Sequence, residues 1–240
     1  MTAEVHHDQM KYAIGQSVPR TEDPKLLKGE GKYTDDLNLP DQVYAAIVRS
    51  PVAHGTITEI NVSDAKKMPG VLLILTGYDL EDYGNLPCGM QIKSKDGSPL
   101  KKPNRPSLVT DKVRFVGDPV ACVIAKTPDA AKDAAEVVSI DIDILPATTL
   151  ATEAAKPGAP VLFDNVAGNV ALDFQFGDPD TVDIAFQTAH HISRVDIRNN
   201  RIVVASMEPR SALAHYNNET DCFTMRLGCQ GTFGMRNQLA

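Results

Sequence analysis

The chain has 240 residues, of which 42% are apolar and 23% are charged, and its formal net charge at pH 7 is −7. This length fits one large domain or one compact domain with part of another, and the apolar share supports a hydrophobic core. The acidic balance argues against nucleic acid as the main partner, because phosphate backbones are bound by basic surfaces.

The first third of the sequence predicts an arm followed by strands. Residues 1–29 are polar and carry turn signals at Pro19 and Pro24, so we expect an extended N-terminal arm. Alternating and apolar runs then predict three strands, at residues 42–49, 56–62 and 71–75. A short helix is expected at Asp64–Met68, and residues 84–106, rich in Gly, Pro, Lys and Ser, are typical of a long surface loop.

The middle of the sequence has the clearest pattern. Strands are expected at residues 112–115 and 119–125, and Thr127 and Pro128 form a cap and first turn for a helix with one small apolar face. Residues 139–145 alternate apolar and polar side chains and predict another strand. Hairpins combined with one crossover helix indicate an α+β sheet domain.

A linker is expected at residues 148–168, where prolines and glycines cluster. The block that follows predicts a helix at residues 179–188 and a second one starting near Thr232. Its expected strands lie at residues 169–177, 191–198, 201–206, 211–216 and 222–228. No capping signal ends the last helix before Ala240, so we expect the chain to be a piece of a longer protein.

Several acidic and histidine residues suggest chemistry but have simpler interpretations. Asp141 and Asp143 could form a metal pair, yet alternation is typical of a solvated strand face. His190 and His191 are adjacent at a strand start, so their side chains point to opposite faces and cannot readily chelate one metal. His54 could be a general base, but spacing assigns it no Ser, Cys or Asp partner, which favours a structural or interface role.

The four cysteines predict neither a metal site nor a disulfide framework. They are Cys88, Cys122, Cys222 and Cys229, and no two of them form a Cys-X-X-Cys pair. We therefore name no metal ligand in this chain. The N-terminal residues lack the basic and apolar regions of a signal peptide, and the longest apolar run, Val71 to Leu75, is too short to span a bilayer. A cytoplasmic protein is expected.

The most suggestive segment for ligand binding is Gly228-Cys229-Gln230-Gly231-Thr232-Phe233-Gly234. It leaves a predicted strand and enters a predicted helix, where backbone N–H groups point toward whatever binds. The glycines allow close approach of a ligand to the backbone, and the Gln230 amide can donate a hydrogen bond. An ordinary strand–helix turn is the alternative interpretation of this segment.

A second polar segment, Glu208-Pro209-Arg210, joins two predicted strands. Its Glu and Arg could bridge to each other or to a neighbouring segment. The proline between them cannot donate a ladder hydrogen bond and stiffens the connection.

A set of short motifs occurs in one order along the chain. They are Gly29-Glu30-Gly31-Lys32-Tyr33-Thr34-Asp35-Asp36, Arg49-Ser50-Pro51-Val52-Ala53-His54, Met68-Pro69-Gly70-Val71, Val113-Arg114-Phe115-Val116-Gly117-Asp118-Pro119-Val120-Ala121, Met207-Glu208-Pro209-Arg210 and Cys229-Gln230-Gly231. In this order they resemble the N-terminal part of the molybdopterin-binding large subunit of the xanthine dehydrogenase / aldehyde oxidase / aerobic carbon monoxide dehydrogenase family. The resemblance covers nearly the whole chain from about Ile14.

The resemblance implies an arm at residues 1–29, an α/β hammerhead domain at 30–147, the linker at 148–168 and an incomplete molybdenum-cofactor-binding domain at 169–240. It further implies hydroxylation or oxidation of a small molecule with oxygen from water. Molybdenum–molybdopterin, in the cytosine dinucleotide form, would be the cofactor of the complete subunit, with FAD and [2Fe–2S] clusters on partner subunits. Gln230 and Gly231 would be cofactor-binding, because the family places a Gln at this position against an oxo ligand of molybdenum.

The sequence departs from the family pattern at Asp118, where the family has Glu. No catalytic base can be named, since the resemblance places that residue beyond Ala240. The substrate class, whether CO, purine, aldehyde or another heterocycle, stays open. The isolated chain is expected to be inactive and to hold no cofactor. The alternative functions are a non-catalytic scaffold that docks the FAD and iron–sulfur subunits, and an independent small-molecule-binding domain.

Overall fold

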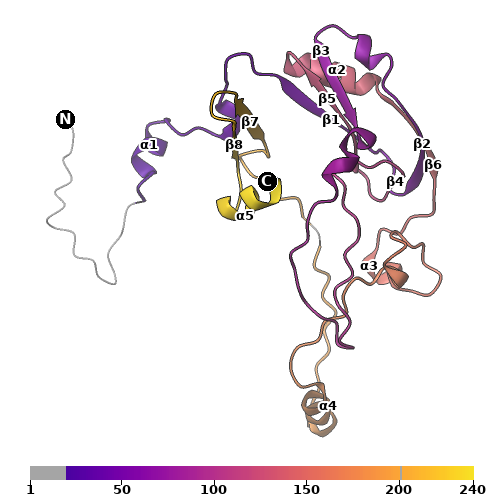
Figure 1. The fold of residues 1–240 in the computed structure, drawn as a ribbon. Coiled ribbons are helices and arrows are strands. Elements are labelled where there is room, and N and C mark those ends of the chain that lie inside the picture. The colour runs from indigo at the N-terminus through magenta and orange to yellow at the C-terminus, as the bar shows by residue number, and fades with distance from the viewer. Residues whose placement is uncertain (1–19, 201) are drawn as a thin grey trace, which may run out of the picture. The chain divides into compact units, whose positions relative to one another are not determined.

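The computed structural model describes residues 20–200 and 202–240. Within these residues the chain divides into two compact units (Figure 1). One, the hairpin unit, contains residues 20–39 and 202–230. The other, the sheet unit, contains residues 40–200 and 231–240.

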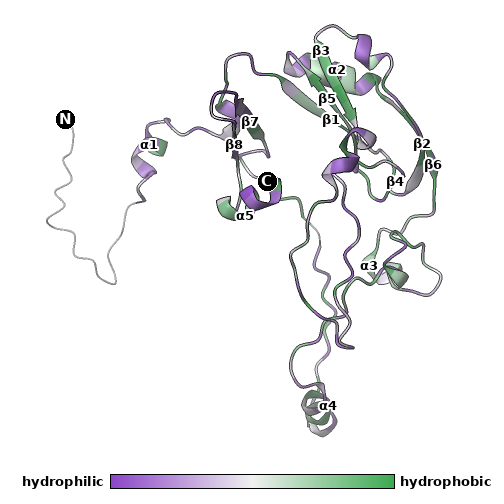
Figure 2. Cartoon of the chain, viewed as in Figure 1, coloured by the Kyte–Doolittle hydropathy of each residue, from purple (hydrophilic) through white to green (hydrophobic). Residues whose placement is uncertain are grey.

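Two antiparallel sheets form the body of the sheet unit. The first has the order β1 (Tyr44–Arg49), β5 (Pro119–Ala125) and β3 (Val71–Thr76). The second has the order β4 (Lys112–Val113), β2 (Gly55–Asn61) and β6 (Ser139–Ile144). The central β5 is the most buried strand, and β3 and β5 stand out as hydrophobic in Figure 2. Mixed helices and antiparallel sheets confirm the α+β prediction.

The helix α2 (Pro128–Val137) was predicted correctly, including its first turn. The Thr127 hydroxyl oxygen accepts a hydrogen bond from the Ala130 backbone N–H at 3.1 Å, and proline occupies the start of the helix. Ala131 and Ala134 are buried, and the helix packs on β1 and β5. Small side chains on this face let the helix approach the sheet closely.

The connections of the sheet unit contain short helices. The 3₁₀ turn η3 (Ala65–Lys67) lies inside the expected helix, whereas η4 (Gly77–Tyr83) was not predicted. Asp79 caps η4, because its carboxylate accepts from the backbone N–H of Thr76 at 2.7 Å and from the Thr76 hydroxyl at 2.8 Å. The remaining helices of this unit are α3 (Ala151–Ala154), η5 (Ala167–Asn169), α4 (Pro179–Thr188) and α5 (Thr232–Leu239).

The loop of residues 84–106 runs beside the segment near residue 172 (Figure 1). Lys95 N donates to Asp173 O at 2.8 Å and Lys101 N donates to Ala171 O at 3.0 Å. The Lys95 ammonium also pairs with the Asp173 carboxylate at 2.8 Å. These isolated contacts replace the strand that the sequence predicts at 169–177, because too few bonds form in succession to build a ladder.

The strands predicted at 191–198 and 202–206 are also wrong for the described residues, which contain no ladder there. The apolar alternation is present, but its side chains are exposed: Ile197 is 84% and Val203 93% accessible. A strand is defined by the chain that pairs with it, and sequence alternation does not supply that partner. The predicted strand at 112–115 ends early, at Val113.

The hairpin unit is built on the antiparallel pair β7 (Ala212–Asn217) and β8 (Cys222–Leu227). The pairs run from Ala212 opposite Leu227 to Asn217 opposite Cys222, beside a turn in which Asp221 has a positive φ of 51°. The same unit contains α1 (Asp23–Leu27) and the 3₁₀ turn η2 (Thr34–Asp36). The helix α1 corrects the prediction of an extended arm for residues 20–29, while residues 1–19 lie outside the described part of the chain.

Candidate cofactor-binding turn

The segment singled out in the sequence is a strand–helix turn, as predicted. The strand β8 ends at Leu227, and Gly231 is the N-cap residue of α5, with its carbonyl accepting from Met235 N at 3.0 Å. Gln230 is exposed, and no described residue bonds to its side-chain amide. The amide donor of Gln230 is therefore available to a ligand.

The space around this turn is open. A Cβ atom built on Gly228, Gly231 or Gly234 would meet nothing within 4 Å. A ligand can thus approach the backbone at each of these glycines. An exposed neutral donor on a glycine-bearing turn fits a cofactor that presents acceptor oxygens, such as the oxo and phosphate groups of a molybdenum–pterin.

The register of the hairpin brings a second predicted segment to the same end. Because Ala212 pairs with Leu227, residues 208–211 precede the first pair and residues 228–230 follow it. Along the chain, Glu208 therefore precedes the same end of the hairpin that Gln230 follows. Sequence spacing alone could not show this, because it does not give the register.

Glu208 forms a bridge to a distant segment, which was one of the two possibilities left open by the sequence. Its Oε1 accepts from Thr34 N at 3.1 Å and from the Thr34 hydroxyl at 3.3 Å. Its backbone carbonyl accepts from the Ser206 hydroxyl at 2.8 Å. The nearby Ser211 hydroxyl is buried and has no partner among the residues that the structure describes.

His54 has a structural role in the sheet unit. It is 5% exposed, and its Nδ1 lies 2.7 Å from the carbonyl oxygen of Pro146. The backbone carbonyl of His54 also accepts from Leu145 N at 3.0 Å. These two bonds fasten the end of the 50–54 turn to the chain after β6, which agrees with the structural role favoured above.

The other sequence candidates do not assemble into a site. Asp141 and Asp143 are exposed on β6, and the His191 Nε2 lies 3.2 Å from the Ser193 hydroxyl. Throughout residues 20–200 and 202–240, no group of three or more His, Cys, Asp or Glu side chains could hold a metal ion. The four cysteines are free, and burial raises the pKa of the Cys122 thiol.

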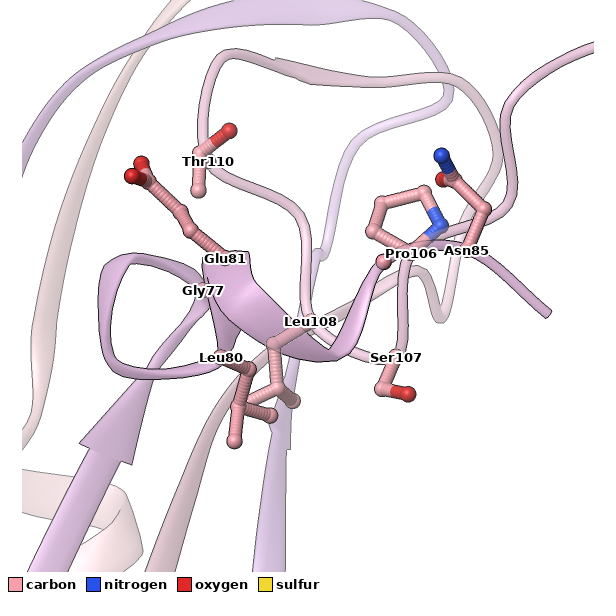
Figure 3. A pocket seen from close by; sticks show the side chains of 9 residues that line it. Gly77, Leu80, Glu81, Asn85, Pro106, Ser107, Leu108 and Thr110 are labelled. Carbon is pink, nitrogen blue, oxygen red and sulfur yellow. The ribbon is translucent and has the colours of Figure 1, made fainter. Parts of the chain in front are cut away.

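A small hollow of about 150 Å³ lies between η4 and the segment before β4 (Figure 3). Glu81 and Thr110 stand at one side, with Asn85 and Pro106 at the other. A Cβ atom at Gly77 would lie 2.7 Å from the carbonyl oxygen of Leu108, so glycine is required for this close approach. No sequence motif pointed to this hollow.

Two family comparisons cover most of the chain. Residues 28–146 match "Aldehyde oxidase and xanthine dehydrogenase, a/b hammerhead domain", and residues 162–240 match "Molybdopterin cofactor-binding domain". The chain belongs to the aldehyde oxidase and xanthine dehydrogenase family. This confirms the resemblance inferred from the ordered motifs and the fold that it implied.

Relatives in this family include large subunits of several enzymes. The chain is 38% identical over 205 residues to the nicotine 6-hydroxylase large subunit of Paenarthrobacter nicotinovorans, a match that covers 85% of this chain and 24% of that protein. It is 36% identical over 158 residues to the carbon monoxide dehydrogenase large chain of Hydrogenophaga pseudoflava, covering 62% of this chain and 18% of that one.

Solved structures of the family share this fold. Quinoline 2-oxidoreductase from Pseudomonas putida 86 aligns with a TM-score of 0.82 and 31% identity, over 94% of this chain and 28% of that one. The chain thus spans about a quarter of the length of the nicotine 6-hydroxylase large subunit and of the matched quinoline 2-oxidoreductase chain. None of the helices in the described parts of the chain has the length and apolarity needed to cross a membrane.

Proposed function

We propose that this chain forms part of the large subunit of a molybdenum hydroxylase, which oxidises a small molecule with oxygen derived from water. The observation that carries the proposal is the unpartnered Gln230 amide on an open turn, within the residues that match the molybdopterin cofactor-binding domain. The names of the relatives, a hydroxylase and a dehydrogenase, support the same reaction class.

Gln230 and Gly231 are proposed as the cofactor-binding residues of this chain. The molybdenum–pterin supplies two-electron oxidation chemistry when it is bound. The Gln230 amide would donate a hydrogen bond to an oxo group of that cofactor and hold it in one orientation. Gly231 would contribute the absence of a side chain, which leaves room for the cofactor beside the turn.

The domain arrangement and the partners belong to the same proposal. The hammerhead at 30–147 and the cofactor-binding segment at 169–240 are supported by the family matches at 28–146 and 162–240. The arm at 1–29 and the linker at 148–168 complete the proposed division. The cytosine dinucleotide form of the cofactor and the FAD and [2Fe–2S] partner subunits follow from the family resemblance. One relative is named as a subunit of a dehydrogenase complex, which supports a hetero-oligomer. The cytoplasmic location stays a prediction.

The substrate we propose is a nitrogen heterocycle. The names of two relatives, nicotine 6-hydroxylase and quinoline 2-oxidoreductase, share this class. A panel of nicotine, quinoline, xanthine, an aldehyde and CO, offered to the complete enzyme, tests it. Turnover of CO alone would contradict the assignment.

The test of the function itself compares two glutamine variants in the complete enzyme, assembled with its partner subunits. With substrate in ¹⁸O-labelled water, wild type should place the label in the product. Gln230→Ala should lower kcat by about a hundredfold, the size of effect seen when one donor to a reacting group is removed. Gln187→Ala, an exposed glutamine on α4, is the matched control. Unchanged molybdenum content and activity in Gln230→Ala would favour the scaffold instead.

A further inference from the structure

The segment Tyr33–Leu39, here called the strap, is fastened to the hairpin unit by Glu208. The Glu208 carboxylate accepts both the backbone N–H and the hydroxyl of Thr34, at 3.1 and 3.3 Å. Thr34 is the first residue of η2, where the backbone N–H has no acceptor within the turn itself. A carboxylate is the favoured partner for such a group, because it is negatively charged.

The strap is held in its own conformation before it reaches Glu208. Tyr33 N donates to the Asp36 carboxylate at 2.8 Å, and Leu37 N donates to Thr34 O at 3.2 Å. These local bonds fix the direction of the Thr34 N–H. The Thr34 N–H that Glu208 accepts therefore belongs to a turn that is already formed by its own hydrogen bonds.

The strap also contacts the face of the hairpin. Leu39 lines a shallow hollow of about 160 Å³ together with Leu213, His215, Thr224 and Arg226. These four hairpin residues form two cross-strand pairs, Leu213 with Arg226 and His215 with Thr224, on one face of β7 and β8. The strap thus touches the hairpin at this face and at Glu208.

Glu208 lies close along the chain to the end of the hairpin that presents Gln230. Ala212 follows Glu208 by four positions and pairs with Leu227, and Gln230 follows Leu227 by three positions. Two-stranded hairpins are marginally stable alone, so their ends fray unless another segment holds them. The hydrogen bonds between Glu208 and Thr34 restrain the chain near this end.

We infer that Glu208 is a positioning residue, which anchors the open end of the hairpin to the strap and so fixes where the Gln230 amide points. This inference rests on the proposed role of Gln230. The sequence stretch Met207-Glu208-Pro209-Arg210 thereby acquires a function: Glu208 makes the anchor, and Pro209 stiffens the link from the anchor to the strand. Arg210 has no part in it.

The experiment uses the complete enzyme with its cofactor and partners, and measures kcat per molybdenum, KM and molybdenum content. Glu208→Ala should lower kcat per molybdenum by about tenfold to a hundredfold, with KM little changed, because misplacing a reacting contact acts on the rate. Glu208→Gln keeps an acceptor oxygen and should restore most of the rate. Thr34→Val removes only the hydroxyl bond and should give an intermediate loss. Glu219→Ala, in the turn at the other end of the hairpin, should match wild type.

Several results would overturn the inference. If Glu208→Ala and Thr34→Val keep the wild-type kcat per molybdenum while Gln230→Ala loses it, positioning by Glu208 fails and the proposed function stands. If Glu208→Ala loses only molybdenum content, its role is structural and the inference also fails. If Gln230→Ala itself is unchanged, the proposed function and this inference both fail. Should Glu208→Ala not assemble, Glu208→Gln and Thr34→Val decide the question alone.

Discussion

The carboxyl group of Asp118 should make the free energy of unfolding depend on pH. Asp118 is buried, and its carboxylate accepts from Arg114 N at 2.9 Å across the turn before β5. Burial raises the pKa of this carboxyl, although the Arg114 bond and nearby arginines oppose the shift. The folded state then keeps its proton to a higher pH than the unfolded chain does. The contribution to stability is present below about pH 4 and is lost as pH rises through the folded pKa.

Two substitutions at this position separate charge from hydrogen bonding. Asp118→Asn keeps an acceptor for Arg114 N and removes the charge, so its free energy of unfolding at pH 7 should equal or exceed that of wild type. Asp118→Ala removes this acceptor from the partly buried Arg114 N–H and should cost about 1–3 kcal/mol. Urea unfolding of the three proteins between pH 4 and pH 7 measures this. Equal losses in both variants would contradict the account.

Two helix caps of similar geometry should contribute differently to the stability of the chain. Thr127 caps α2, which packs on β1 and β5, whereas Asp178 caps α4, which buries no residue. Asp178 accepts from Thr181 N at 3.1 Å and from the Thr181 hydroxyl at 2.6 Å, and these bonds lower its pKa.

Loss of the Thr127 cap should lower the stability of the whole chain, whereas loss of the Asp178 cap should affect α4 alone. Thr127→Ala should lower the free energy of unfolding of the chain by about 1 kcal/mol. Asp178→Ala should leave it unchanged and only speed hydrogen exchange within α4. Because the Asp178 pKa is depressed, acidification through that pKa should fray α4 in wild type as the substitution does. Slow exchange in α4 of Asp178→Ala would contradict this.

Elements whose signals are local were predictable from the sequence. The residues of α2 include its cap and its alanine face, and those of β5 form an apolar run, so each element can be predicted from its own residues. Both elements were confirmed. The turn η4 was missed although Thr76 and Asp79 formed a visible cap pair. The strands at 191–198 and 202–206 were not predictable, since pairing depends on a partner. The Glu208 bond to Thr34 crosses 174 residues, so the sequence offered the possibility of a bridge without its partner.

For the molecule as a whole, exposed apolar side chains should determine whether the chain self-associates. Val203, Met207 and Phe223 are each more than 80% accessible in the hairpin unit. Such surface favours association. We expect the isolated chain to self-associate with increasing concentration in sedimentation velocity. The complete enzyme, in which further parts of the subunit would cover this surface, should not. A single monomer species of the isolated chain at high concentration would contradict the expectation.

The most direct test of the account is a structure of the complete subunit with its cofactor bound. In that structure the Gln230 side-chain nitrogen should lie about 3 Å from an oxo oxygen of the cofactor, within hydrogen-bond distance. The Glu208 carboxylate should still accept from Thr34. A Gln230 amide directed away from the cofactor, or a cofactor bound elsewhere in the subunit, would contradict it.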